Sequence, residues 1–309
     1  MIIDKEITDR FALYHADTVE VAKLLPDRSV GFSVFSPPFA SLYTYSSSPR
    51  DMGNVRSYDE FWEQYRFLVK ETARVMMAGR IVAIHCMALP TSKTMHGRIG
   101  LYDFPGEIVR AYEAEGFVYH SKICIWKDPV VAMQRTKALG LLYKQLKKDS
   151  AMSRQGISDD VIVMRAPGGN DEPVTHTEQE FPVALWQRYA SPVWATLGQT
   201  NNDGIINCEQ DINPSETLQY RSAREDKDER HICPLQLEVI RRCVRLWSNP
   251  GDSVWSPFAG IGSEGVVALE EGRRFIGAEL KESYYRQATK NLLAAEKPAQ
   301  QSMFGAASQ

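Results

Sequence analysis

The chain has 309 residues, of which 43% are hydrophobic and 24% are charged, and its formal net charge is −3. This composition is ordinary for a globular protein of one or two domains, and it excludes a chain that binds nucleic acid through overall positive charge. Any contact with a polyanion must therefore come from a local group of basic side chains.

The cysteines indicate neither a metal site nor a disulfide framework. They are scattered, no pair has the spacing of zinc ligands, and we expect reduced thiols in a cytoplasmic protein. They are Cys86, Cys124, Cys208, Cys233 and Cys243. The first residues lack the pattern of a signal peptide, and no stretch is long and apolar enough to span a membrane.

Strands and helices are predicted to alternate through the first part of the chain. The predicted strands are residues 11–15, 30–35, 81–86 and 117–126, and the predicted helices are residues 18–25, 58–77 and 104–115. Asp17 or Thr18 can cap the first helix, and Gly79 is expected to end the second. Residues 40–57 and 90–100 are predicted loops, the former long enough to be functional. This alternation indicates an α/β fold with a doubly wound, mostly parallel sheet.

The alternation stops between residues 130 and 228. We predict here an inserted, irregular region, with residues 159–166 as a candidate edge strand of the core sheet. Its first part is basic, and the side chains concerned are Arg135, Lys137, Lys144, Lys147, Lys148 and Arg154. A solvated helix face is the ordinary meaning of such a run, and contact with a polyanion is the alternative.

Regular α/β patterning returns at about residue 229. The predicted elements are a helix over residues 234–246, a strand over 253–255, a helix ending at 271, a strand over 274–278 and a helix over 281–296. We therefore expect residues 1–129 and 229–297 to form one domain, with residues 298–309 as a flexible tail.

A rigid lip is predicted at the end of the strand over residues 30–35. Ser36-Pro37-Pro38-Phe39 follows this strand, and two consecutive prolines cannot continue a sheet ladder. The lip offers a hydroxyl, carbonyl acceptors and an aromatic ring at the sheet edge where α/β proteins bind ligands. A planar, amine-bearing substrate could stack on Phe39 and donate to Ser36, although a simple Pro-Pro turn is the plainer interpretation.

A second motif has the form of a nucleotide site. The strand over residues 253–255 leads into Gly260-Ile261-Gly262, a helix follows, and the next strand ends at Glu279. The glycines let the backbone approach a ligand, the helix start supplies free N–H groups, and the acid can accept from ribose hydroxyls. Gly265 could complete a dinucleotide fingerprint, so a nicotinamide cofactor stays open on this motif alone.

Together the two motifs resemble those of the amino-group DNA methyltransferases of the permuted β class. That family pairs a [DNS]-P-P-[YFW] tetrapeptide with an F-x-G-x-G loop for S-adenosylmethionine, in the order catalytic motif, recognition region, cofactor loop. Here Ser36-Pro37-Pro38-Phe39 comes first and Phe258-Ala259-Gly260-Ile261-Gly262 last. Residues 123–127 and 231–235 also look like family blocks that flank the recognition region.

The resemblance implies a Rossmann-like methyltransferase domain, with residues 130–228 recognising double-stranded DNA. It assigns catalysis to Ser36, Pro37, Pro38 and Phe39. It assigns cofactor binding to Asp17, Ser256, Pro257, Phe258, Gly260, Gly262, Ser263 and Glu279. The basic side chains of residues 133–154 become candidate DNA contacts. No metal is expected.

The resemblance also implies that a flipped base donates its exocyclic amine to the lip. A leading serine favours N4-cytosine, with N6-adenine as the alternative. Ser256 departs from the more usual aspartate, which keeps open a non-catalytic DNA-binding module on a degenerate fold. Methylation of RNA or of protein glutamine is a further alternative, against which the permuted order and the large insertion argue.

Two partner predictions are independent of this site. Gln300, Met303 and Phe304 resemble a short peptide that docks on bacterial sliding clamps, although a disordered tail with chance apolar residues is the plainer interpretation. The chain could also form a homodimer.

Overall fold

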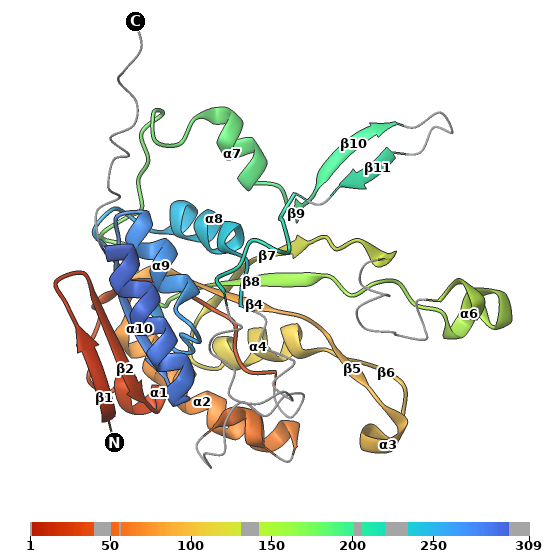
Figure 1. Cartoon of the computed structure of the whole chain (residues 1–309), viewed down its shortest axis with the longest axis horizontal. Coiled ribbons are helices and arrows are strands. Elements are labelled where there is room, and N and C mark those ends of the chain that lie inside the picture. The colour runs from red at the N-terminus through yellow and green to blue at the C-terminus, as the bar shows by residue number, and fades with distance from the viewer. Residues whose placement is uncertain are drawn as a thin grey trace, which may run out of the picture.

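A nine-stranded sheet forms the centre of the molecule, in the order β1-β2-β13-β12-β3-β4-β8-β7-β9 (Figure 1). The computed structural model describes residues 2–39, 51–55, 57–130, 142–200, 206–209, 211–219 and 234–296, and for 94, 95, 196–200 and 206–209 the backbone alone. The strands of this sheet are β1 (Ile2–Ile7), β2 (Phe11–Ala16), β3 (Val30–Phe35), β4 (Met76–Cys86), β7 (Val118–Ile125), β8 (Asp159–Arg165), β9 (Val193–Trp194), β12 (Ser253–Ser256) and β13 (Arg274–Glu279). Strands β2, β13, β12, β3 and β4 run parallel, whereas β1 and β8 are antiparallel to their neighbours.

Helices cover both faces of this sheet (Figure 1). They are α1 (Thr18–Ala22), α2 (Tyr58–Val75), α4 (Phe104–Glu113), α8 (Leu237–Trp247), α9 (Ser263–Glu270) and α10 (Glu282–Glu296). Buried side chains of α1, α2 and α4 belong to one hydrophobic cluster, and those of α8, α9 and α10 mainly to another. Helices on both faces of a mostly parallel sheet confirm the predicted doubly wound α/β fold.

Strand β8 corrects the prediction of an edge strand over residues 159–166. It lies inside the sheet, antiparallel to β4 on one side and to β7 on the other. Every residue from Asp159 to Met164 is buried. Strands β8 and β9 come from the stretch predicted as an insertion, so part of residues 130–228 belongs to the main sheet.

The end of α2 also differs from the prediction. The helix ends at Val75, and Met76 already pairs with Val30 of β3, so pairing with a buried strand overrides the helical spacing. Gly79 lies at an irregularity of β4 with φ of 72°, where a Cβ atom would lie 2.6 Å from Asn170 Cβ. This glycine therefore permits a bulge in a strand and does not end a helix.

Several short elements lie where loops or nothing regular were predicted. Strand β1 precedes the first predicted strand, and β5 and β6 with α3 occupy the predicted loop 90–100. Their bounds are β5 (Leu89–Thr91), α3 (Lys93–His96), β6 (Gly100–Tyr102), β10 (Thr196–Thr200), β11 (Ile206–Glu209), α6 (Tyr143–Lys148), α7 (Val183–Tyr189), and the 3-10 turns η2 (Met52–Asn54) and η4 (Ser150–Met152). Short runs of this kind carry too little periodicity to be recognised from sequence.

Three of these segments project from one side of the sheet (Figure 1). The hairpin β5–β6 follows the end of β4, α6 follows the end of β7, and the ribbon β10–β11 follows β9. All three strands end at the same edge, because β7 and β4 are both antiparallel to β8 and β9 is parallel to β7. The projections therefore surround the edge at which the predicted catalytic lip ends.

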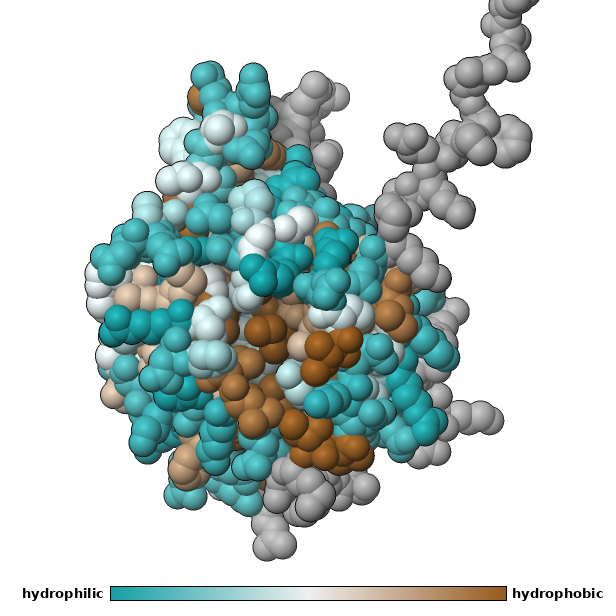
Figure 2. All heavy atoms as spheres, turned by 90° about the vertical axis from the view of Figure 1, so that its left-hand side faces the viewer, coloured by the Kyte–Doolittle hydropathy of each residue, from teal (hydrophilic) through white to brown (hydrophobic). Residues whose placement is uncertain are grey.

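The opposite side of the molecule carries apolar surface. Figure 2 shows hydrophobic side chains gathered among polar ones on the side formed by β1, β2 and α10. Ile3 and Ile7 of β1 are 64% and 51% exposed. Strand β1 and helix α6 lie at opposite ends of the molecule (Figure 1). Within the described residues, no helix combines the length and apolar character needed to cross a membrane.

Candidate active site

The two sequence motifs meet at neighbouring strand ends. Strands β3 and β12 pair in parallel, with Trp255 opposite Ser33, and Ser33 Oγ donates to the Trp255 carbonyl at 2.8 Å. The rings of Phe35 and Phe258, one from each motif region, lie 5.8 Å apart between centroids. The prediction that the lip and the glycine loop lie side by side at one sheet edge is confirmed.

The lip is held by burial of its prolines. Pro37 and Pro38 are buried, whereas Ser36 and Phe39 are partly exposed. The Phe39 ring meets Phe104 of α4 edge to face, with centroids 6.1 Å apart. Fixed φ angles and burial give the Ser36 hydroxyl and the proline carbonyls a rigid frame in which to accept hydrogen bonds.

A chain of polar contacts continues from Ser36 into the sheet. Ser36 Oγ lies 2.9 Å from His85 Nδ1 on β4, and His85 Nε2 lies 3.3 Å from Asp159 Oδ2 on β8. Asp159 Oδ1 is 2.5 Å from Lys127 Nζ, just beyond β7. Four neighbouring strands thus supply one chain of polar groups at the lip, because β8 lies between β4 and β7.

Asp159 is ionised in this chain. Burial alone would raise its pKa, but hydrogen bonding and charge from His85 and Lys127 lower that pKa to about 2. His85, Lys127 and Asp159 were not predicted as site residues. The residue types are ordinary in sequence, and only the placement of β8 inside the sheet brings them together.

The glycine loop has the backbone of a ligand-binding turn. Gly260 and Gly262 have φ of 53° and 87°, a region that favours glycine, and no atom lies within 4 Å of a Cβ built at Gly260. Asn291 Nδ2 of α10 donates to the Ile261 carbonyl at 2.8 Å. The loop is therefore held by α10 through the Ile261 carbonyl, and it leaves space for a ligand at Gly260.

Glu279 closes this loop at the end of β13. Its Oε2 accepts from Gly260 N and its Oε1 from Lys281 N, both at 2.8 Å. Each oxygen keeps a further lone pair for a ligand. Burial, with a smaller contribution from the charge of Asp51, raises the pKa of Glu279 to about 7.

The residues around the loop fit a polar cofactor. Ser256 and Ser263 are buried, and neither Oγ has a hydrogen-bond partner among the described residues. Buried hydroxyls without partners lose free energy that a polar ligand would restore. Pro257 is buried and Phe258 partly exposed beside them.

Asp17 lies at the same edge, after the end of β2, which pairs with β13. Its Oδ1 accepts from Val19 N at 3.0 Å and Glu20 N at 3.2 Å, so it caps α1. The cap interpretation of this residue is confirmed, and its predicted place near a cofactor stays a prediction.

The predicted DNA contacts fall partly outside the described residues. Lys144, Lys147 and Lys148 are exposed on α6, a helix with no buried residue. Arg154 lines a cavity of about 540 Å³ together with Trp126 and Lys127. Lys127 also pairs with Asp159, so it belongs both to the cavity lining and to the chain of polar groups that begins at Ser36. The remaining predicted contacts, Arg135 and Lys137, and the tail residues Gln300, Met303 and Phe304 lie outside the described residues.

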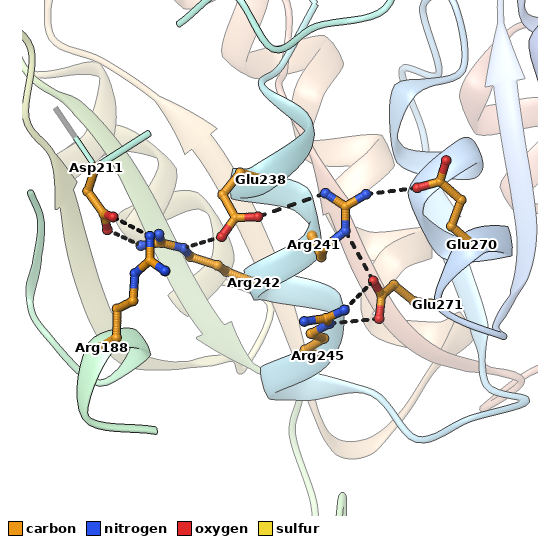
Figure 3. Close-up of polar contacts among 8 residues, drawn as sticks. All are labelled: Arg188, Asp211, Glu238, Arg241, Arg242, Arg245, Glu270 and Glu271. Atoms are coloured by element: carbon orange, nitrogen blue, oxygen red, sulfur yellow. Dashed lines mark hydrogen bonds and ion pairs between the residues drawn. The ribbon is translucent and has the colours of Figure 1, made fainter. Parts of the chain in front are cut away.

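An ion-pair network ties residues 130–228, called the middle region below, to helix α8 of the core (Figure 3). Arg242 of α8 is fully buried, its Nη1 lies 2.7 Å from Asp211 Oδ2, and its Nε donates to Glu238 at 3.0 Å. Arg188 of α7 pairs with the same Asp211. The guanidinium of Arg242 also lies over the Trp194 ring of β9, 5.0 Å from its centroid. Segments far apart in sequence are thus fixed on α8.

The described geometry agrees with a comparison to known families. Residues 30–290 match the DNA methylase family of N6-adenine and N4-cytosine methyltransferases. The chain belongs to this family. The methyltransferase uses S-adenosylmethionine to methylate DNA, as the paired lip and loop indicated.

Two named relatives align with most of the sequence of this methyltransferase. It is 37% identical over 284 residues to the type II methyltransferase M.XycI of Xanthomonas campestris pv. cyanopsidis, covering 91% of this chain and 87% of the relative. It is 23% identical over 276 residues to the type II methyltransferase M.Cfr9I of Citrobacter freundii, covering 88% of this chain and 84% of the relative.

Solved structures share the fold. A protein named as a DNA modification methylase of Thermus thermophilus, complexed with S-adenosyl-L-methionine, matches with a TM-score of 0.63 at 22% identity, covering 93% of this chain and 96% of that one. The cytosine-N4-specific PvuII DNA methyltransferase matches with a TM-score of 0.61 at 14% identity, covering 94% of this chain and 90% of that one.

Proposed function

We propose that this enzyme methylates the N4 amine of a cytosine within a specific sequence of double-stranded DNA. The observation that carries the proposal is the Ser36 hydroxyl at the end of β3, one strand from the glycine loop that follows β12. Serine at the first position of the lip favours cytosine, by the resemblance stated above. N6-adenine is the second candidate, because both amines present the same donors.

The lip residues have separate roles in this proposal. The target base leaves the duplex and stacks on the partly exposed ring of Phe39. Ser36 Oγ and the Pro37 carbonyl accept from its exocyclic amine, and the buried prolines keep both acceptors in place. These contacts orient the nitrogen lone pair, so the chain contributes position and electrostatics to a direct displacement.

The cofactor site lies beside the lip. S-adenosylmethionine supplies the methyl group as a sulfonium donor. Glu279 would accept from its ribose hydroxyls, Ser256 and Ser263 would bind it through their unpartnered hydroxyls, and Asp17 would lie near its adenine. Pro257, Phe258, Gly260 and Gly262 shape the pocket.

The projecting segments hold the DNA. Residues 130–158 and 166–228 contribute recognition, with Lys144, Lys147 and Lys148 of α6 contacting phosphates. Arg154 and Trp126 line a cavity at the same edge, where a cation and an aromatic ring suit DNA.

The test is identification of the methylated nucleoside. The purified chain is incubated with duplex DNA and methyl-labelled S-adenosylmethionine, and the digested DNA is separated by mass spectrometry. We expect N4-methylcytosine. N6-methyladenine would overturn the base, and label in RNA or protein without label in DNA would overturn the substrate.

Substitution of the lip tests the site in the same assay. Ser36→Ala and Phe39→Ala should each lose most transfer while cofactor binding survives, because the loop does not depend on these side chains. Ser121→Ala, on strand β7 outside the lip, is the control and should retain transfer. Full activity in both lip variants would refute the site.

A further inference from the structure

The hydroxyl of Ser36 can accept from an amine only if its own proton points elsewhere. His85 Nδ1 lies 2.9 Å from Ser36 Oγ, and the other ring nitrogen faces Asp159 at 3.3 Å. An ionised carboxylate at this distance would repel a nitrogen lone pair, so Nε2 carries the ring proton and Nδ1 is left to accept from Ser36. The lone pairs of Ser36 Oγ then stay available to the substrate.

We propose that His85 is a positioning residue for methyl transfer. Its Nδ1 holds Ser36 as an acceptor and receives, through Ser36, the proton that the amine loses. This inference rests on the proposed function in one respect, namely that the target atom is an exocyclic amine nitrogen.

The proton balance follows from the Ser36–His85 hydrogen bond and the His85–Asp159 ion pair. The amine nitrogen gives an electron pair to the methyl carbon, the carbon–sulfur bond breaks, and its electrons remain on sulfur. The methylated nitrogen, now positively charged, loses one proton to Ser36 Oγ while the Ser36 hydroxyl proton passes to His85 Nδ1. Ser36 ends as it began, and the His85 imidazolium returns its proton to solvent after the product leaves.

The surroundings of His85 suit a transient positive charge. Asp159 faces Nε2 directly, and Lys127 pairs with the other oxygen of that carboxylate. Asp160 is the next residue along β8, and Lys122 of β7 lies 3.9 Å from its Oδ2. The negative charges of Asp159 and Asp160 offset the positive charges of Lys122 and Lys127. A proton on His85 would therefore add a positive charge in direct contact with the Asp159 carboxylate. The His85 side chain is 12% exposed, so bulk water screens this pair weakly.

The first test replaces the ring by a side chain that accepts but does not titrate. In His85→Asn an amide oxygen can still accept the Ser36 proton. We expect the single-turnover rate of methyl transfer to fall about 10²- to 10⁴-fold, the usual contribution of a positioned proton acceptor. Affinities for S-adenosylmethionine and DNA should not change.

The matched control is a second histidine–serine pair in the same protein. His120 Nδ1 lies 2.9 Å from Ser121 Oγ on the exposed part of β7. His120→Asn should leave the rate as in the wild type.

A second measurement does not depend on activity. Nitrogen-15 NMR of the imidazoles in the free protein should show His85 protonated at Nε2, with Nδ1 accepting a hydrogen bond. Ser36→Ala and Asp159→Asn should both change this spectrum, and His120→Asn should not change the His85 signals.

Three results would overturn the proposal. One is a His85→Asn enzyme with the wild-type rate. Another is an additive loss when Ser36→Ala and His85→Asn are combined, because groups that act in one chain are not additive. The third is loss of cofactor binding or of folding in His85→Asn together with a wrong tautomer in the wild type. A wild-type product methylated elsewhere than on an amine would instead refute the proposed function.

Discussion

At the scale of single residues, the two motifs have different electrostatic environments. Asp159, behind the lip, is kept ionised by His85 and Lys127. Glu279, in the cofactor loop, has a pKa raised to about 7 by burial and the nearby Asp51. One carboxylate is thus charged at every working pH, and the other titrates near neutrality.

We predict that cofactor affinity depends on pH through Glu279. A raised pKa means that the carboxyl gains a proton as pH falls through about 7, and the neutral form is a weaker acceptor for ribose hydroxyls. Affinity for S-adenosylmethionine, measured by calorimetry, should therefore fall as pH decreases from 8 to about 6, one unit below that pKa.

Glu279→Gln should bind the cofactor more weakly than the wild type at pH 8 and show little pH dependence over this range. Glu282→Gln, an exposed change in the first turn of α10, is the control and should behave as the wild type. Wild-type affinity in Glu279→Gln would remove this residue from the cofactor site.

At the scale of elements, α8 joins the middle region to the core. Its face toward the middle region carries the buried Arg242, and its other side pairs Arg241 and Arg245 with Glu270 and Glu271 at the end of α9 (Figure 3). These pairs differ in exposure, since Arg242 is fully buried whereas Glu270 is 45% exposed. Their contributions to stability should differ accordingly.

We predict that Asp211→Asn destabilises the protein by about 3 kcal/mol, because it leaves the buried Arg242 short of one of its two carboxylates. Urea unfolding measures the change. Glu270→Gln breaks a more exposed pair and should cost less than about 1 kcal/mol. Equal effects of the two substitutions would contradict the importance of burial in this network.

At the scale of the whole molecule, three exposed lysines gather on α6 although the net charge is only −3. The exposed lysines of α6 lie at the end where the projecting segments surround the lip, and β1 lies at the far end (Figure 1). DNA bound at the lip would therefore lie close to α6 and far from β1.

We predict that replacing Lys144, Lys147 and Lys148 by glutamine weakens DNA binding equally for all sequences. The slope of log affinity against log salt should become shallower by about 0.9 for each phosphate that α6 no longer neutralises. Cofactor affinity should stay unchanged. Lys5→Gln and Lys290→Gln, on β1 and α10, are the controls. A salt slope equal to that of the wild type would exclude α6 from the DNA interface.

The sequence by itself determined the α/β class, the order of the two motifs and the elements that carry them. Strands β3 and β12 were predictable because each is a short, mainly apolar segment with β-branched and aromatic residues, and prolines and glycines lie in the turns that flank it. Ser36, Gly260 and Glu279 could be selected as site candidates for the same reason.

Only the tertiary structure decided what stands behind Ser36. His85 and Asp159 lie on strands that are distant in sequence, and nothing local in either strand indicates that β8 inserts between β4 and β7. Strand order depends on packing of whole faces against helices, which local periodicity does not encode. The same holds for Arg242 and Asp211, whose pairing follows from the path of the middle region across α8.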